Sequence, residues 1–88
     1  MGDLIIQPEE LQKSAQAFKK ASKDTSAILK KLDETTSSLE NKWSGVTQQT
    51  FYKQYRELRQ YMEGFAAMMT NIAQEMQAMA DRFEKADQ

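Results

Sequence analysis

The chain of 88 residues contains neither cysteine nor histidine. Without cysteine, a disulfide framework, a zinc knuckle and thiol catalysis are excluded. Without histidine, the chain lacks the commonest metal ligand and the usual general base near pH 7. We find no catalytic pair among the acidic residues, and we interpret groups such as Asp33 with Glu34 as solvated or helix-terminal charges. The sequence therefore predicts a protein that is not an enzyme and that binds no metal and no cofactor.

The chain also lacks a charge excess and a long apolar run. Twelve Lys and Arg residues stand against thirteen Asp and Glu residues, whereas a nucleic-acid-binding domain normally carries a basic excess on one face. No stretch approaches the roughly 18 apolar residues of a membrane span, and no polar face is rich in Lys and Arg as in membrane-surface helices. We therefore expect no nucleic-acid partner and no stable membrane insertion.

A secretory signal peptide is also missing, because the N-terminus has no basic segment and its only apolar run covers residues 4–6. Taken alone, this feature indicates a cytosolic protein.

Glycine and proline are scarce, and their positions divide the chain. Pro8 is the only proline and suits the first turn of a helix, where Glu9 and Glu10 complement the helix dipole. Gly45 lies at the midpoint, and neither glycine nor proline interrupts residues 9–44. The sequence predicts an all-α hairpin of two long helices, about 8–42 and 46–86, forming a single domain over residues 1–88.

The apolar residues recur at alternating spacings of four and three, which is typical of a heptad seam between helices. In the second half this seam comprises Phe51, Tyr55, Leu58, Met62, Phe65, Met69, Ile72, Met76, Met79 and Phe83. In the first half it comprises Leu11, Ala15, Phe18, Ser22, Thr25, Leu29, Leu32, Thr36, Leu39 and Trp43. The methionines are interpreted as core, although flexible thioethers also suit surfaces that accept several partners.

A hairpin alone leaves much of this seam uncovered. Two rods of about 50 Å that touch along one line bury much less surface than the ~64% that a compact domain of this mass buries. Further residues widen the stripe on the second helix beyond what one partner helix can cover, namely Tyr52, Tyr61, Ala66, Met68, Ala73 and Ala80. We therefore predict dimerisation into an antiparallel four-helix bundle. The partner is a second copy or a related hairpin protein, and the self-sufficient seams favour a homodimer.

The only tryptophan, Trp43, allows two interpretations. With Gly45, which can adopt a positive φ, it forms either a helix end closed by an aromatic plug or a recognition element at the tip of the hairpin. A partly exposed indole at such a tip is well suited to docking.

The chain resembles the WXG family of type VII secretion substrates, which includes the early secreted antigenic target of mycobacteria. The resemblance is carried by Trp43-Ser44-Gly45 between two helices in a chain of about a hundred residues. Pro8-Glu9-Glu10-Leu11 also matches the helix opening of the Gram-positive branch, and Phe51 follows Trp43 by eight residues, as an aromatic often does there. Gln54-Tyr55 followed by Leu58 fits as well.

This resemblance implies export without a cleaved signal peptide, as a folded homodimer or heterodimer, by a membrane machine with an FtsK/SpoIIIE-type ATPase. We therefore expect an extracellular protein that acts by protein binding. The family's export signal combines Trp-Xaa-Gly from one subunit with a C-terminal Tyr-x-x-x-Asp/Glu from its partner. Here no tyrosine precedes an acid at that spacing, and the best match runs from Phe83 to Asp87.

The resemblance thus implies that Trp43, Gly45, Phe83 and Asp87 dock to the ATPase, while Phe83 also fits as the last seam residue. The departure at Phe83 leaves a second function open, a cytosolic targeting factor that pairs with a larger exported toxin.

Overall fold

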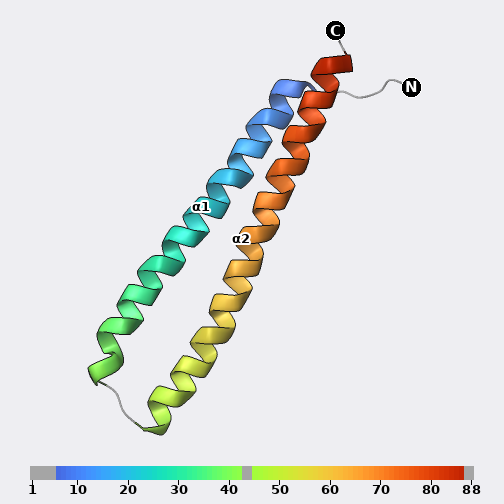
Figure 1. The fold of residues 1–88 in the computed structure, drawn as a ribbon. Helices are drawn as coiled ribbons and strands as arrows, with labels where there is room; N and C mark the ends of the chain where they lie inside the picture. The colour runs from blue at the N-terminus through green and yellow to red at the C-terminus, as the bar shows by residue number, and fades with distance from the viewer. Residues whose placement is uncertain (1–5, 43–44, 87–88) are drawn as a thin grey trace.

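The protein is a hairpin of two long antiparallel helices (Figure 1). The structure is a computed structural model, and it describes residues 6–42 and 45–86. Helix α1 covers Pro8–Leu39, a short 3-10 helix η1 covers Glu40–Lys42, and helix α2 covers Val46–Ala86. In Figure 1 the two helices lie side by side along their length, so that the start of α1 lies beside the end of α2. The predicted helical hairpin is confirmed.

Proline begins the first helix as the sequence predicts. Gln7 has an extended backbone (φ −87°, ψ 151°), and Pro8 takes the first helical turn. The Gln7 carbonyl accepts hydrogen bonds from the backbone N–H groups of Glu10 and Leu11, at 3.0 and 3.3 Å. The α-helix ends at Leu39, three residues before the predicted end, because the last turn tightens to 3-10 geometry, which is common at helix ends.

The second helix starts from a glycine in the left-handed region. Gly45 has φ +79°, as the sequence allowed, and its carbonyl accepts a hydrogen bond of 3.2 Å from the Gln49 N–H in the first turn of α2. A Cβ atom at this position would meet no atom within 4 Å. The glycine is therefore needed for its backbone conformation rather than for space.

The core lies between the two helices, and α1 supplies it with the predicted positions. Its buried residues are Leu11, Ala15, Ser22, Leu29 and Thr36, while Phe18, Leu32 and Leu39 are half-buried. On α2 the buried residues are Ala66, Met69, Ala73 and Ala80. Half-buried positions of the predicted α2 seam are Phe51, Tyr55, Met62, Met76, Met79 and Phe83.

Three residues of the predicted α2 seam are not covered by α1. Leu58, Phe65 and Ile72 are exposed in the single chain. Helix α2 instead turns its row of alanines toward α1, because small side chains let two helices approach closely. The larger residues are thereby displaced to one side of the contact.

Hydroxyl groups of Ser22 on α1 and Tyr52 on α2 form hydrogen bonds across the hairpin. Ser22 Oγ donates to the Ala66 carbonyl oxygen at 2.9 Å and lies 2.8 Å from Thr70 Oγ1. The Tyr52 hydroxyl donates to the Thr36 carbonyl oxygen at 3.2 Å. Within the described residues, no buried side-chain nitrogen or oxygen lacks a hydrogen-bond partner. These bonds fix the register of the two helices. They also compensate for the loss of hydration when polar groups of the seam are buried.

The hairpin is long and thin. It measures 64 × 20 × 15 Å, and its radius of gyration of 19.7 Å far exceeds the about 12 Å of a compact chain of this length. Its accessible surface is 6975 Å², against about 5,300 Å² for a compact protein of this mass. The single chain therefore leaves an unusual amount of surface uncovered.

Candidate functional site

One side of α2 carries an uncovered apolar stripe. Its five residues follow one another at spacings of three and four and are Leu58, Tyr61, Phe65, Met68 and Ile72. Their exposed fractions run from 37% at Ile72 to 77% at Tyr61. Side chains at this spacing lie on one face of a helix, so the stripe is a continuous surface rather than scattered exposed residues.

Helix α1 extends this surface. Ala17, Phe18 and Ala21 line a shallow hollow of ≈ 160 Å³ together with Met69, which neighbours the stripe on α2. Ile28 follows Ala21 by two helical turns and is 52% exposed. We call the stripe together with Phe18, Ala21 and Ile28 the apolar face. Six of the eight large apolar side chains exposed in the described part of the chain belong to it, and the other two, Ile6 and Val46, lie at helix starts.

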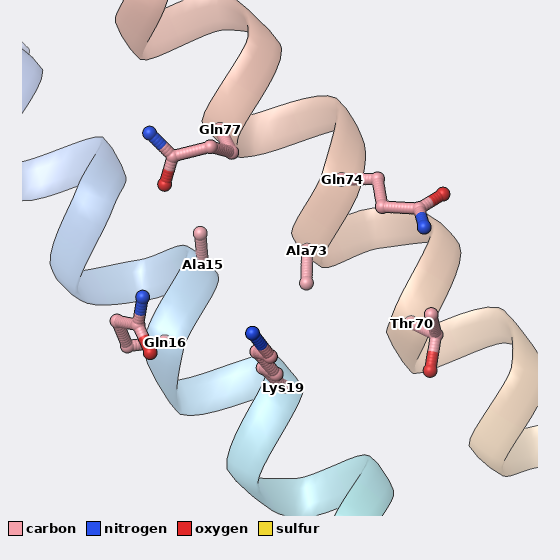
Figure 2. Close-up of a pocket in the computed structure, with 7 residues that line it drawn as sticks. All are labelled: Ala15, Gln16, Lys19, Thr70, Ala73, Gln74 and Gln77. Atoms are coloured by element: carbon pink, nitrogen blue, oxygen red, sulfur yellow. The ribbon is translucent and has the colours of Figure 1, made fainter.

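A groove on another side of the helix contact is lined by two alanines and by longer uncharged and basic side chains. Figure 2 shows Ala15 and Ala73 between the two helices, surrounded by longer side chains from both. The groove has a volume of ≈ 220 Å³, and its remaining lining residues are Gln16, Lys19, Thr70, Gln74 and Gln77. None of them is a carboxylate, so the groove offers hydrogen bonds and one positive charge but no acid–base pair.

A charged cluster joins the helices nearer the turn. Arg59 binds Asp33 as a fork, with Nε 3.0 Å from Oδ1 and Nη2 2.8 Å from Oδ2. The Tyr55 hydroxyl also donates to Asp33, and Arg59 pairs with Glu63 in the next turn. Arg59, followed by Tyr55, lowers the pKa of the Asp33 carboxyl to about 2. Asp33 is therefore an interhelical partner, and its interpretation as a solvated or helix-terminal charge was wrong.

The sequence carried a signal for this cluster. In a hairpin that folds back at residue 45, positions whose numbers sum to about 90 lie opposite one another, as Ser22 and Ala66 do. Asp33 and Arg59 satisfy this condition. Opposite charges at matching positions of two predicted antiparallel helices would have indicated the pair.

Of the four residues of the expected export signal, the structure describes Gly45 and Phe83, and these two lie far apart in one chain. Trp43 and Asp87 lie outside the described residues. Gly45 immediately precedes α2, whereas the half-buried Phe83 lies in its last turn, at the other end of the hairpin (Figure 1). Near the turn, the Phe51 ring packs edge-on against Tyr52 and stacks on Tyr55, with centroids 5.3 and 6.0 Å apart.

Comparison with known proteins decides the family. The sequence profile of the family described as "Proteins of 100 residues with WXG" (WXG100) matches residues 3–88. The chain belongs to the WXG100 family. This assignment confirms the resemblance to the WXG family that the sequence indicated.

Relatives and solved structures agree with this assignment over nearly the whole chain. An ESAT-6-like protein of Streptococcus agalactiae is 30% identical over 87 residues, which are 99% of this chain and 91% of that protein. The type VII secretion system extracellular protein A of Staphylococcus aureus is 26% identical over 88 residues, or 100% and 91% of the two chains. The crystal structure of the secreted protein EsxB from Bacillus anthracis has a TM-score of 0.90 and 30% identity, and the match covers 100% of both chains. EsxA of Geobacillus thermodenitrificans has a TM-score of 0.86 and 27% identity, with 96% and 91% covered.

Membership in the WXG100 family confirms three predictions made from the sequence. The protein is a small helical hairpin, it is non-enzymatic, and it belongs with extracellular proteins of type VII secretion. Over the described ranges, neither helix has an apolar stretch that could cross a membrane. The same ranges contain no group of three or more acidic residues placed to hold a metal ion.

Proposed function

We propose that this WXG100 protein pairs with a second copy of itself and is exported in that form by a type VII secretion system, where it acts by binding other proteins. The observation that carries this proposal is the apolar face. In this reading, residues 1–88 form one helical-hairpin domain, and the dimer is an antiparallel four-helix bundle.

The uncovered area is large enough for a stable partner. The chain exposes roughly 1,700 Å² more than a compact protein of its mass, whereas a standard interface takes about 800 Å² from each side. Contiguous exposed apolar surface larger than a few hundred Å² typically marks an interaction site. The apolar face therefore favours a permanent partner over solvent.

The order of residues along the stripe favours a second copy as that partner. If two stripes cross in opposite directions about Phe65, Leu58 meets Ile72 of the second copy and Tyr61 meets Met68 of the second copy. Aliphatic groups then face aliphatic groups, and each thioether faces an aromatic ring, a favourable contact. The two Phe65 rings meet at the twofold axis. A stripe that complements itself in this way suits an isologous dimer.

Antiparallel pairing also assembles the expected export signal. It places the turn of one copy beside the C-terminal end of the other copy's α2. Trp43 and Gly45 of one copy then approach Phe83 and Asp87 of the second. We propose that this composite surface, with an indole and a phenyl ring beside a carboxylate, docks to the FtsK/SpoIIIE-type ATPase.

The function is tested by export from the native host. We expect the untagged protein in the culture medium of cells with an intact secretion ATPase, and its loss from the medium when the ATPase is inactivated. A cytosolic marker protein controls for lysis. Trp43→Ala should abolish export, while Lys42→Ala, on the neighbouring 3-10 helix, should not. If the Trp43→Ala variant folds, forms the dimer and is still exported normally, that result would contradict the docking proposal.

Phe83 favours one alternative. It stands where the family's export motif has tyrosine, so its ring lacks the hydroxyl group and the hydrogen bond that goes with it. A targeting factor that stays in the cytosol and escorts a larger toxin would not need a complete motif. In that case the protein stays in the cells and purifies with a larger native partner, and Phe83→Tyr increases its release into the medium.

A further inference from the structure

One methionine differs from the others in its surroundings. Of the five methionines in the described part of the chain, Met68 alone is exposed, with an exposed fraction of 61%. Its neighbour Met69 is buried between the helices with 6% exposed, and the others, Met62, Met76 and Met79, are half-buried. Two adjacent thioethers therefore differ about tenfold in access to solvent.

This difference matters because sulfur chemistry in the chain is confined to methionine. The sequence contains no cysteine that could react first with an oxidant. Hydrogen peroxide oxidises a thioether by transferring one oxygen atom to sulfur. The O–O bond breaks, an S–O bond forms, the peroxide is reduced to water and methionine is oxidised to methionine sulfoxide. The product is polar, and reductases convert it back to methionine.

We propose that Met68 is an oxidation site that controls assembly: peroxide converts Met68 of the free chain to the sulfoxide, and the modified chain no longer pairs through the apolar face. This inference rests on the pairing proposed above. Met68 lies between Phe65 and Ile72 on the stripe, so pairing covers its sulfur and protects it. Oxidation therefore acts on the unpaired chain and keeps it unpaired.

The size of the effect follows from the surroundings of Met68 on the stripe. Phe65 and Ile72 offer the sulfoxide oxygen no hydrogen-bond donor. In the proposed pairing Met68 faces Tyr61 of the second copy, so the sulfoxide exchanges its contacts with water for at most one tyrosine hydroxyl, which is unfavourable. A twofold interface contains two such groups. We expect oxidation of Met68 to raise the dimer Kd at least about tenfold, which corresponds to about 1.4 kcal/mol.

The test compares the full chain before and after treatment with hydrogen peroxide. Mass spectrometry of peptides locates each added oxygen, and sedimentation equilibrium measures the dimer Kd. We expect Met68 to be oxidised before Met62, Met69, Met76 and Met79. Oxidation of Met68 should be slower at protein concentrations where the dimer dominates. The Kd should rise with the fraction of Met68 oxidised, and methionine sulfoxide reductases should reverse the change.

Two variants separate the site from general damage. Met68→Leu keeps a similar volume without sulfur, so its dimer should form normally and resist peroxide. Met69→Leu, the adjacent control, should remain as sensitive as the unmodified sequence. Earlier oxidation of another methionine, or equal sensitivity of the Met68→Leu dimer, would overturn the inference while leaving the pairing intact. A chain that is monomeric before any oxidation would overturn both.

Discussion

Truncation of Phe65 tests the apolar face most directly. A phenylalanine side chain carries roughly 200 Å² of surface, and 57% of Phe65 remains exposed in the single chain. Covering that surface in a dimer contributes ~3 kcal/mol per copy at ~25 cal/mol per Å². Alanine would retain a minor part of this contribution, so Phe65→Ala should cost about 2 kcal/mol per copy. Because each dimer contains two copies, its Kd should rise about a thousandfold, or ~4 kcal/mol.

Sedimentation equilibrium over a wide range of protein concentrations measures this change. Val46→Ala is the matched control, because Val46 is apolar and 78% exposed but lies at the first residue of α2, away from the stripe. We expect the control to change the Kd by less than about threefold, as is usual for surface substitutions. A Phe65→Ala protein that dimerises as tightly as the control would refute the assignment of the apolar face to a second copy.

Three further predictions address orientation, charge and the turn. Since the chain has no cysteine, Phe65→Cys should yield disulfide-linked dimers on a non-reducing gel and Leu58→Cys should not; the reverse pattern would exclude antiparallel pairing about Phe65. The Asp33 pKa of about 2 lies below its value of 3.8 in an unfolded chain, so its stabilising effect is complete above pH 4 and is lost as the pH falls toward 2. Asp33→Asn should therefore lower the thermal midpoint much more at pH 7 than at pH 2, and equal losses at both pH values would contradict the ion pair with Arg59. Gly45→Ala should reduce the free energy of unfolding by ~1–2 kcal/mol because of its φ of +79°, and an unchanged urea transition would contradict that conformation.

The sequence was sufficient for the hairpin because its signals are local. Pro8 marks the start of the first helix and Gly45 marks the turn. The uninterrupted heptad spacing then indicates one helix between Pro8 and Gly45 and a second helix after Gly45. The seam on α1 could also be predicted, since its buried residues all lie at the heptad positions that the spacing indicates. Each of these features depends on residues that are neighbours in the chain.

The rotation of α2 about its own axis could not be predicted in the same way. The row of Leu58, Phe65 and Ile72 and the row of Ala66, Ala73 and Ala80 are both apolar, and hydrophobicity alone does not say which one faces α1. The close approach that alanine permits decides between them, and this property belongs to the packed pair of helices. The link between Asp33 and Arg59 likewise depends on the register across the hairpin.

The groove around Ala15 and Ala73 has a consequence for the number of copies that can assemble. A chain with apolar surfaces on two opposite sides can add partners without end and grow into a filament. In this hairpin the groove is bordered by glutamine, lysine and threonine, and the two alanines within it are already buried between the helices. The proposed pairing through the apolar face therefore closes at two chains instead of growing into a fibre.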